Sequence, residues 1–435
     1  MIPQWLIEKK RDGASLSDQE IHAFIAGFTD GSIPEYQMAA LAMAVFFQGM
    51  TASETAALTD AMMRSGDLIS FEGWPRPVAD KHSTGGIGDK LSLMIAPLAA
   101  AAGLAVPMIA GRGLGITGGT VDKLESIPGY DTYLSIAEFQ RVIEVVGCSI
   151  IGQTDNLAPA DKKLYALRDV TGTVPSIPLI TASIMSKKLA EGADTLVLDV
   201  KCGRAAFMKN QQDAEALARS LITVGRVLGR KCDAIITNMD QPLGRTAGNA
   251  VEVIEAIETL KGGGPPDTRL LTIELTAMMT VLSNVYPDLN SAREKLAELL
   301  DNGAALACFR HMVEEQRGDA GVIDDYTRFP QPGATVEIKA QAKGFVAEVN
   351  ADTIGRVVLQ LGGGRRKNED VIDHAAGVDC LVQQGEIVEK EGVLMRLHAR
   401  REELAHSLVE YARTAVAISD TPPPERELMI TRSEA

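Results

Sequence analysis

The sequence predicts an α/β fold with a mostly parallel sheet. From about Val78, short apolar runs alternate with helical patterns and glycine-rich loops, and three of the runs are predicted buried strands: Cys148–Ile151, Thr195–Val200 and Ala234–Thr237. Hydrophobic residues make up 46% of the chain and aromatic residues only 4%, which suits a helix-rich α/β protein better than a β-sandwich. A chain of 435 residues is too long for one ordinary domain, so two or three are expected.

The first 65 residues are expected to form a small helical unit. A Ser or Thr followed three residues later by Glu has the spacing of a capping box, and this pattern precedes helical apolar patterns at Ser17 and Thr51. The pattern recurs at Ser135, in the later part of the chain. The helix predicted within Gln37–Gln48 is apolar nearly all round. Such a helix either lies in a core or also contributes to a subunit interface, and the pattern leaves both uses open.

A separate C-terminal module is predicted after Phe329–Gly333, a proline-rich stretch with the composition of a domain boundary. Beyond it, residues 335–350 alternate in the manner of antiparallel strands, and two more short strands are expected within 385–390 and 392–398. These patterns indicate a compact α+β module. The tail after Thr421 is expected to be extended.

Composition argues against several classes of partner. The formal net charge is −15, so the chain as a whole repels nucleic acid and anionic membranes, and any anionic ligand must be held by local cations and backbone amides. The five cysteines are scattered without a C-x-x-C pair, which indicates neither a zinc site nor a disulfide framework. The first residues show no apolar signal segment. We therefore expect a cytoplasmic protein.

One uncharged stretch, Leu91–Gly111, has the length of a membrane span. It contains Pro97, Gly103 and Pro107, and alanine forms much of the rest. This composition favours a buried helix followed by a buried strand.

The segment Asp80–Asp89 (DKHSTGGIGD) is the densest in chemistry-bearing residues. Its three glycines allow backbone N–H groups to converge on an anion, and the helix expected after it adds its positive end. Lys81 supplies a charge, while Ser83 and Ser92 supply hydroxyl donors. The string is not a Walker A loop, because the chain contains no G-x-x-x-x-G-K-[ST] pattern. We interpret it as an anion-binding loop, with a plain glycine turn as the alternative.

A second glycine-rich segment, Gly111–Thr120 (GRGLGITGGT), contains a G-x-G-x-x-G match at Gly113–Gly118 that suggests a dinucleotide site. That signal is weak, because Pro107 interrupts the preceding strand and no acidic residue is clearly placed for a ribose. A second anion-binding loop, with Thr120 at the start of a helix, explains the glycines equally well.

A third cluster is polar and has two parts, Ala160–Asp169 and Ser176–Lys188. If the second part is helical, Ser183 and Lys187 lie one turn apart on one face. The alternative is a surface ion pair in the first part and a solvated charge in the second, where Lys187 and Lys188 are adjacent.

These motifs resemble those of the thymidine and pyrimidine-nucleoside phosphorylase family. The likeness runs from about Ile7 into the C-terminal module, and it is more specific to the family than to the substrate. The strings that carry it are Lys81–Asp89, Gly111–Thr120, Asp122–Gly129, Ile151–Thr154, Ala158–Lys162, Tyr165–Asp169 and Ser176–Ile180.

The resemblance implies a fold that spacing alone does not give. A small all-helical domain, made of residues 1–66 and 158–190, faces a larger α/β domain across a hinged cleft. The α/β domain comprises residues 67–157 and 191–333, and the C-terminal α+β module, residues 334–435, packs onto it. Hinge closure brings phosphate and nucleoside together, and the family works as homodimers through the helical domain.

The implied reaction is the phosphorolysis of a pyrimidine nucleoside with inversion at C1′, with inorganic phosphate as co-substrate and no cofactor. Positive charge builds on the sugar and negative charge on the base, so cations aimed at the base stabilise the leaving group. His82 is placed near O2 of the base, where it donates a proton as the base leaves.

Two further groups of residues are carried over by matching position. The first contacts the nucleoside, and its members are Arg168, Ser183, Lys187 and Phe207. The second binds phosphate, and its members are Lys81, Ser83, Ser92 and Thr120. The residues expected to be catalytic are His82, Arg168 and Lys187.

Three positions near the expected phosphate site depart from the family pattern. Ala110 stands where the family has a serine, and a lost hydrogen bond to a charged group is worth about 1.5–3 kcal/mol. Ile116 replaces a histidine in the second glycine-rich segment. Arg204, within Lys201–Met208 (KCGRAAFM), either grips phosphate and so offsets Ala110, recognises an extra anionic group, or is a surface charge.

A fourth departure is Lys90. Several family members bind a monovalent cation at the positions that correspond here to Gly88, Lys90, Leu243, Thr246 and Glu255. A lysine ammonium can occupy that hole itself and pair with Glu255. We therefore expect this chain to bind no metal there, with Lys90 in place of the ion.

Two other functions remain open from the sequence. An anthranilate-type phosphoribosyltransferase has a similar fold and glycine loop. It needs a magnesium–diphosphate site, however, and the sequence shows no convincing acidic pair to form one. The C-terminal module also argues against this function. A non-catalytic paralogue that binds nucleoside or phosphate is suggested by Ala110 and Ile116, and the retained cations oppose it. The sequence also does not decide whether the preferred substrate is thymidine or uridine, or whether its sugar is deoxyribose or ribose.

Overall fold

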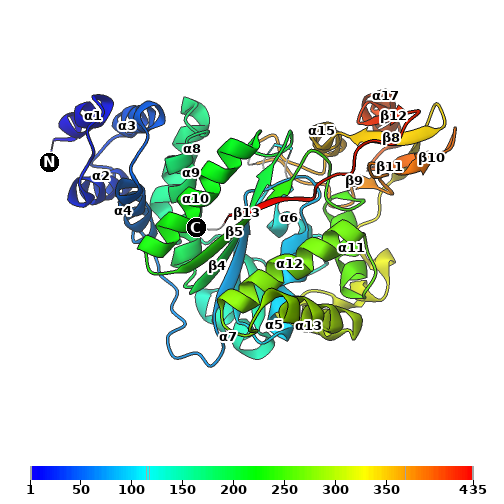
Figure 1. Cartoon of the computed structure of the whole chain (residues 1–435), viewed down its shortest axis with the longest axis horizontal. Helices are drawn as coiled ribbons and strands as arrows, with labels where there is room; N and C mark the ends of the chain where they lie inside the picture. The colour runs from blue at the N-terminus through cyan, green and yellow to red at the C-terminus, as the bar shows by residue number, and fades with distance from the viewer. Residues whose placement is uncertain (1, 114, 117, 368, 434–435) are drawn as a thin grey trace.

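The computed structural model describes residues 2–113, 115–116, 118–367 and 369–433. It has three parts in a row: a helical domain, a central α/β domain and a C-terminal module with strands (Figure 1). The predicted fold class is therefore confirmed. Leu114 and Thr117, which belong to the second glycine-rich segment, lie outside the described residues.

The helical domain is built from two separate stretches of the chain. The first stretch forms α1 (Pro3–Arg11), α2 (Asp18–Asp30), α3 (Glu35–Gln48) and α4 (Ala52–Met63), and the second forms α8 (Pro159–Thr171) and α9 (Ile177–Ala190). The capping boxes predicted at Ser17 and Thr51 are both present, at the starts of α2 and α4. Phe24 and Leu58 from the first stretch share one buried core with Leu164 from the second, so the two stretches fold as one unit.

The central sheet has the strand order β1-β4-β5-β13. Its members are β1 (Ala79–Ser83), β4 (Thr195–Cys202), β5 (Lys231–Asn238) and β13 (Met429–Ser433). The first three strands are parallel, and β13 is antiparallel to β5. A second parallel pair, β2 (Val106–Ala110) with β3 (Cys148–Gly152), continues from β1 through a bridge between Val78 and Ala105. All three strands predicted as buried are present.

Every residue of β4 is buried, because helices cover both faces of this sheet. Leu196 and Leu198 belong to the core cluster that contains α10 (Gln211–Val227), whereas Val197 belongs to the cluster of α5 (Leu91–Ala101) and α12 (Pro266–Leu282). The same layer also contains α6 (Thr120–Leu124), α7 (Ile136–Val146), α11 (Ala250–Leu260), α13 (Leu289–Asp301) and α14 (Ala304–Glu315), and the short 3₁₀ helices η1 (Ala320–Ile323) and η2 (Tyr326–Arg328) follow. The capping box predicted at Ser135 starts α7.

The uncharged stretch predicted as a buried helix and strand forms α5 and β2, with the α5 residues Leu91 to Ala100 almost entirely buried except Ser92. Among the described residues, no helix has both the length and the apolar character needed to cross a membrane.

The C-terminal module contains two small antiparallel sheets and three helices. One sheet has the order β6-β9-β11-β7 and the other β10-β8-β12. The strands are β6 (Ala247–Gly248), β7 (Ala334–Lys339), β8 (Gly344–Val349), β9 (Gly377–Asp379), β10 (Ile387–Val388), β11 (Val393–Ala399) and β12 (Val416–Ser419), and the helices are α15 (Ala351–Leu361), α16 (Glu402–Ser407) and α17 (Val409–Arg413). Because β6 comes from the α/β domain, the first sheet joins the two parts.

Strands β7 and β8 form where alternation predicted antiparallel strands, each in its own antiparallel sheet. One detail of the C-terminal prediction needs correction. The tail after Thr421 is more than an extended ending, since its last part returns to the α/β domain as β13 and pairs with β5.

Candidate active site

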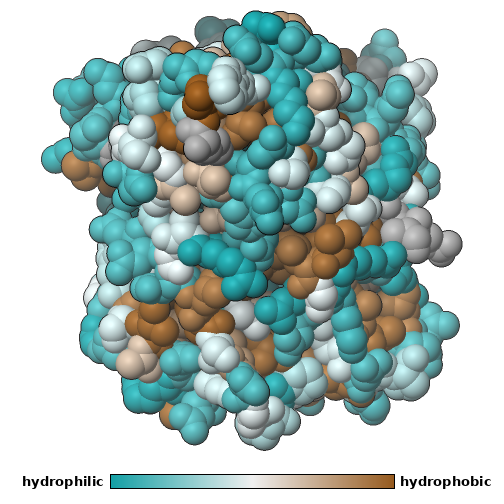
Figure 2. All heavy atoms as spheres, turned by 90° about the vertical axis from the view of Figure 1, so that its left-hand side faces the viewer, coloured by the Kyte–Doolittle hydropathy of each residue, from teal (hydrophilic) through white to brown (hydrophobic). Residues whose placement is uncertain are grey.

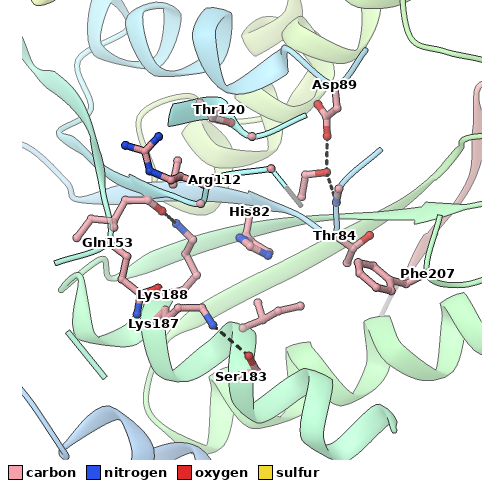
Figure 3. Close-up of a pocket in the computed structure, with 18 of the residues that line it drawn as sticks. His82, Thr84, Asp89, Arg112, Thr120, Gln153, Ser183, Lys187, Lys188 and Phe207 are labelled. Atoms are coloured by element: carbon pink, nitrogen blue, oxygen red, sulfur yellow. Dashed lines mark hydrogen bonds between the residues drawn. The ribbon is translucent and has the colours of Figure 1, made fainter. Parts of the chain in front are cut away.

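A cavity of about 620 Å³ lies where the carboxyl ends of β1 and β2 meet α8 and α9, a volume typical of small-molecule sites (Figure 3). The carboxyl ends of parallel strands are the usual place for a ligand in an open α/β sheet. Nine of the ten residues expected to contact substrate or phosphate line it, and they are Lys81, His82, Ser83, Ser92, Thr120, Arg168, Ser183, Lys187 and Phe207. The tenth, Arg204, does not.

Lys81 is a buried cation in the wall of this cavity. It lies on β1, its side chain is 0% exposed, and its Nζ atom has no hydrogen-bond partner in the described part of the chain. The nearest carboxylate oxygens belong to Asp89 and Asp199, at 4.0 and 3.9 Å. Burial lowers the pKa of Lys81, and the two carboxylates oppose that effect. A buried ammonium without hydrogen bonds favours an anion that can supply them.

Lys201, at the carboxyl end of β4, is a second buried cation beside Lys81, and the sequence analysis did not identify it as a site residue. Its Nζ atom lies 2.6 Å from Asp199 Oδ2 and donates to Thr237 Oγ1 at 3.1 Å. Although burial disfavours its charge, Asp199 and Asp89 raise the pKa of Lys201. Asp89 is ionised for the reciprocal reason: burial opposes its charge, but Lys201, Lys81 and Lys123 hold its pKa well below the ordinary value.

The first glycine loop is shaped by Ser83 and Asp89. The Ser83 hydroxyl donates to Asp89 and accepts the backbone N–H of Gly85 at 3.1 Å. Ser92 lies in the first turn of α5 and Thr120 opens α6, so both hydroxyls stand at helix N-termini facing the cavity.

The second glycine loop folds back on itself at Gly119, where an added Cβ would lie 2.1 Å from the backbone N of Gly113. Only glycine fits there, and this explains part of the motif without a dinucleotide.

The opposite wall comes from α8 and α9. Lys187 donates to Ser183 Oγ at 3.0 Å, as their predicted one-turn spacing requires (Figure 3). Lys187 also pairs with Asp161. Arg168 is buried and donates to three backbone carbonyls, those of Thr173, Leu179 and Val174, at 3.4, 3.0 and 2.7 Å. The alternative in which Arg168 belongs to a surface pair is therefore wrong. Its fork has five N–H donors, so donors remain for a ligand.

Lys188, one of the two adjacent lysines, is not a solvated charge. It is buried and donates to Asp80 Oδ2 at 2.9 Å, to the carbonyl of Ile109 at 2.8 Å and to Glu191 Oε2 at 3.0 Å. Burial raises the pKa of Glu191 well above its ordinary value, and Asp80 adds to this effect. This cluster connects α9 to β1, the strand that also carries His82.

His82 lies between the two walls (Figure 3). Burial first, and then the nearby charges of Lys188, Lys187 and Lys81, lower the pKa of His82 well below 6.5. The imidazole is therefore neutral at neutral pH. It keeps one N–H donor but is not a charged acid in the ligand-free protein.

The remaining wall near α9 and α10 is apolar. Val174, Ile180, Ile184 and Leu217 line it, and Phe207, whose side chain is 53% exposed, stands at the rim. A flat, weakly polar ring fits such a surface, with Arg168 and Lys187 at its polar edge.

Three residues near the expected phosphate site depart from the family pattern, and they lie in different places in the structure. Ala110 lines the cavity at the end of β2. Ile116 packs against the core of the C-terminal module and touches Gly355 of α15, so it anchors the second glycine loop outside the cavity. Arg204 lies outside the cavity lining and pairs with Glu348 and Asp240. Within the described residues there is also no group of three or more His, Cys, Asp or Glu placed to hold a metal ion.

Three family models match successive stretches of the chain, and the second match includes α8 and α9 of the helical domain. Residues 4–66 match the family described as "Glycosyl transferase family, helical bundle domain", and residues 75–306 match "Glycosyl transferase family, a/b domain". Residues 345–419 match "Pyrimidine nucleoside phosphorylase C-terminal domain".

Curated relatives agree with these matches. The chain is 50% identical over 397 residues to the pyrimidine-nucleoside phosphorylase of Staphylococcus haemolyticus, covering 91% of this chain and 92% of that protein. The chain belongs to this family. The pyrimidine-nucleoside phosphorylase of Geobacillus stearothermophilus is 48% identical over 399 residues, 92% of each chain. The resemblance drawn from the glycine-rich motifs is thus confirmed.

A solved structure adds evidence on the fold alone. The crystal structure of anthranilate phosphoribosyltransferase from Thermus thermophilus matches with a TM-score of 0.57 and 19% sequence identity, covering 72% of this chain and 99% of that one. The two proteins share an architecture, and at this identity the likeness says nothing about a shared reaction.

Because the folded protein holds His82 in its neutral form, His82 makes the folded protein less stable in acid. In the unfolded chain the imidazole binds a proton below about pH 6.5, whereas the folded protein resists this, so stability falls as the pH drops below that value, by at most about 1.4 kcal/mol per pH unit. We predict that His82→Gln flattens the fall in melting temperature between pH 7.5 and 5. The exposed His406→Gln serves as the control and should leave the profile unchanged; a His82→Gln profile parallel to that of the unmodified protein would contradict the burial argument.

Proposed function

We propose that this protein cleaves pyrimidine nucleosides with inorganic phosphate, releasing the free base and a pentose 1-phosphate. One observation carries the proposal: a single cavity has on one wall a buried ammonium, Lys81, without a hydrogen-bond partner in the described part of the chain, and on the other wall two cations, Arg168 and Lys187. A nucleoside and a phosphate ion need these two kinds of contact at once. Family membership supports the same reaction.

The charges fit the transition state. As the bond between C1′ and the base breaks, negative charge develops on the base, where Arg168, Ser183 and Lys187 supply donors aimed at its oxygens and N3. Phosphate held at Lys81, with the hydroxyls of Ser83, Ser92 and Thr120, attacks C1′ from the opposite face. Attack from that face inverts the configuration at C1′.

His82 acts in this scheme first as a hydrogen-bond donor to O2 of the base. A neutral imidazole can donate through its N–H without carrying a charge. Arrival of the phosphate anion near Lys81 partly cancels the positive field that lowers the pKa of His82, so proton donation becomes easier once both substrates are bound.

The scheme requires closure of the helical domain over the α/β domain. Lys187 is paired with Asp161 in the present arrangement, and closure is proposed to move its ammonium toward the base. Closure also excludes water, which competes with phosphate as a nucleophile. The proposed reaction uses no cofactor, and a cytoplasmic location suits the five free cysteines.

We predict phosphate-dependent release of base from uridine, deoxyuridine or thymidine. The three nucleosides would be incubated with and without phosphate, the base followed by chromatography and the sugar phosphate by ³¹P NMR. The expected result is base plus the α-anomer of the sugar 1-phosphate, and no base without phosphate. Equal release in the absence of phosphate would identify a hydrolase instead, and no release from any of them would contradict the proposal.

The matched variants for this assay are Lys81→Met and Lys209→Met. Loss of a charged hydrogen bond of about 1.5–3 kcal/mol predicts that Lys81→Met lowers kcat/KM for phosphate by at least about tenfold. Lys209 is exposed and donates to the carbonyl of Arg204, so Lys209→Met removes the same charge away from the cavity and should leave the rate unchanged.

We also propose that the chain forms a homodimer through the outer face of the helical domain. Tyr36, Met43 and Phe47 lie on one face of α3 by their helical spacing and remain exposed, while Met38 and Val45 point into the core. Figure 2 shows hydrophobic side chains gathered between hydrophilic ones on this side of the molecule. A contiguous apolar surface of this kind is typical of an interface.

The dimer proposal predicts that Phe47→Asp yields a monomer in light scattering after size-exclusion chromatography. Val371→Asp, a change at an exposed apolar residue of the C-terminal module, should remain dimeric. A monomeric unmodified protein, or a dimer that Phe47→Asp leaves intact, would contradict this interface.

A further inference from the structure

Lys90 is a buried cation inside a closed shell of oxygen atoms. It is the residue before α5, immediately after the first glycine loop, and its side chain is 0% exposed. Its Nζ atom lies 2.9 Å from the carbonyl oxygen of Leu243, 3.2 Å from that of Thr246 and 3.0 Å from Thr246 Oγ1, and it is paired with Glu255. We refer to these four oxygens as the Lys90 cage.

The donor set of this cage is that of a monovalent cation site. Two backbone carbonyls, a hydroxyl and one carboxylate balance a single positive charge, and such oxygens can replace the hydration shell of an alkali ion. An ammonium has three N–H donors, so it cannot donate fully to all four oxygens, whereas a spherical ion has no such limit. The geometry thus suits a cation in general, and in this chain the cation is the side-chain ammonium of Lys90.

No room for a second cation remains beside Lys90. A Cβ added at Gly244 would lie 2.0 Å from Glu255 Oε1 and 2.9 Å from Lys90 Nζ, and one added at Gly88 would lie 2.5 Å from the Leu243 carbonyl. The backbone therefore closes around the ammonium. A separate potassium ion does not fit in the cage together with the Lys90 ammonium.

We infer that the Lys90 ammonium is the resident cation of this cage, and that this protein holds its phosphate loop without a monovalent metal ion. The inference rests on the proposed function only for its kinetic consequence.

The cage connects the phosphate loop to the rest of the molecule. Glu255, on α11, also accepts the backbone N–H of Arg245 at 2.9 Å, and the Arg245 guanidinium donates to the carbonyl of Leu381 at 3.1 Å and pairs with Glu386 in the C-terminal module. On the other side, Lys90 directly follows Asp89, the acceptor of the Ser83 hydroxyl. Lys90 is accordingly a positioning residue that acts on phosphate through the loop.

The first test uses the unmodified protein. Melting temperature and phosphorolysis would be measured in potassium chloride and in tetramethylammonium chloride at equal ionic strength, after exhaustive dialysis into each salt. Both quantities should be the same in the two salts within error. A melting temperature or rate that rises clearly when potassium replaces the organic cation would overturn the inference.

The second test vacates the cage. Lys90→Ser leaves the oxygens with space for an ion, so potassium, but not tetramethylammonium, should raise its melting temperature by mass action. In tetramethylammonium its KM for phosphate should be about tenfold higher, which corresponds to about 1.4 kcal/mol, with a smaller change in kcat, and potassium should reverse most of this. Lys90→Met fills the same space with an apolar chain, so potassium should rescue neither quantity.

Lys10→Ser is the matched control for these variants. Lys10 is also buried and bonded to a glutamate, Glu54, at 2.8 Å, but it lies in the helical domain and forms an ordinary ion pair rather than occupying a cage. Its destabilisation should be the same in both salts. If Lys90→Ser shows no potassium-dependent melting, or does not fold in either salt, the cage is not a cation site and the inference fails. Because melting needs no turnover, this outcome is separable from failure of the proposed reaction.

Discussion

The structure depends on a buried network of charges at the carboxyl ends of β1 and β4. Lys81 and Lys201 face Asp89 and Asp199 in an interior where an isolated charge is costly, so the opposite charges stabilise one another. Lys201 donates to Thr237 and lies 2.6 Å from Asp199 Oδ2, whereas Lys81 has no hydrogen bond in the described part of the chain. The N–H donors of Lys81 therefore favour an anion beside it, and the glycine loops bring hydroxyl and backbone donors to the same place.

Other buried ion pairs between a lysine and a carboxylate lie around the cavity. Lys188 joins α9 to β1, and Lys123 holds the carbonyl of Asp89 while pairing with Glu252. Lys90 fills its cage one residue further along. These pairs explain how a chain with a net charge of −15 can place cations around the cavity: carboxylates hold these buried lysines in position.

Local signals predicted local structure well. All three capping boxes form, because a Ser or Thr and a Glu three residues apart satisfy each other's backbone donors without help from the rest of the fold. The contact of Ser183 with Lys187 follows from helical spacing in the same way. Features that depend on distant partners were not predicted. Buried Lys188 on α9 is stabilised by Asp80, which lies 108 residues earlier on β1. Strand β13 pairs with β5, and the two are separated by about half of the chain. The expectation of a helical domain made from two stretches came from the motif resemblance, because no single segment specifies such a domain.

The central claim is that phosphate sits at Lys81 and the base at α8 and α9, on opposite sides of His82. The most direct measurement is a crystal structure with phosphate and uracil bound together. The account predicts phosphate density within hydrogen-bond distance of Lys81 Nζ and the hydroxyls of Ser83, Ser92 and Thr120, and uracil against Arg168 and Lys187. Phosphate bound instead at Arg204, or uracil in the glycine loops, would contradict it.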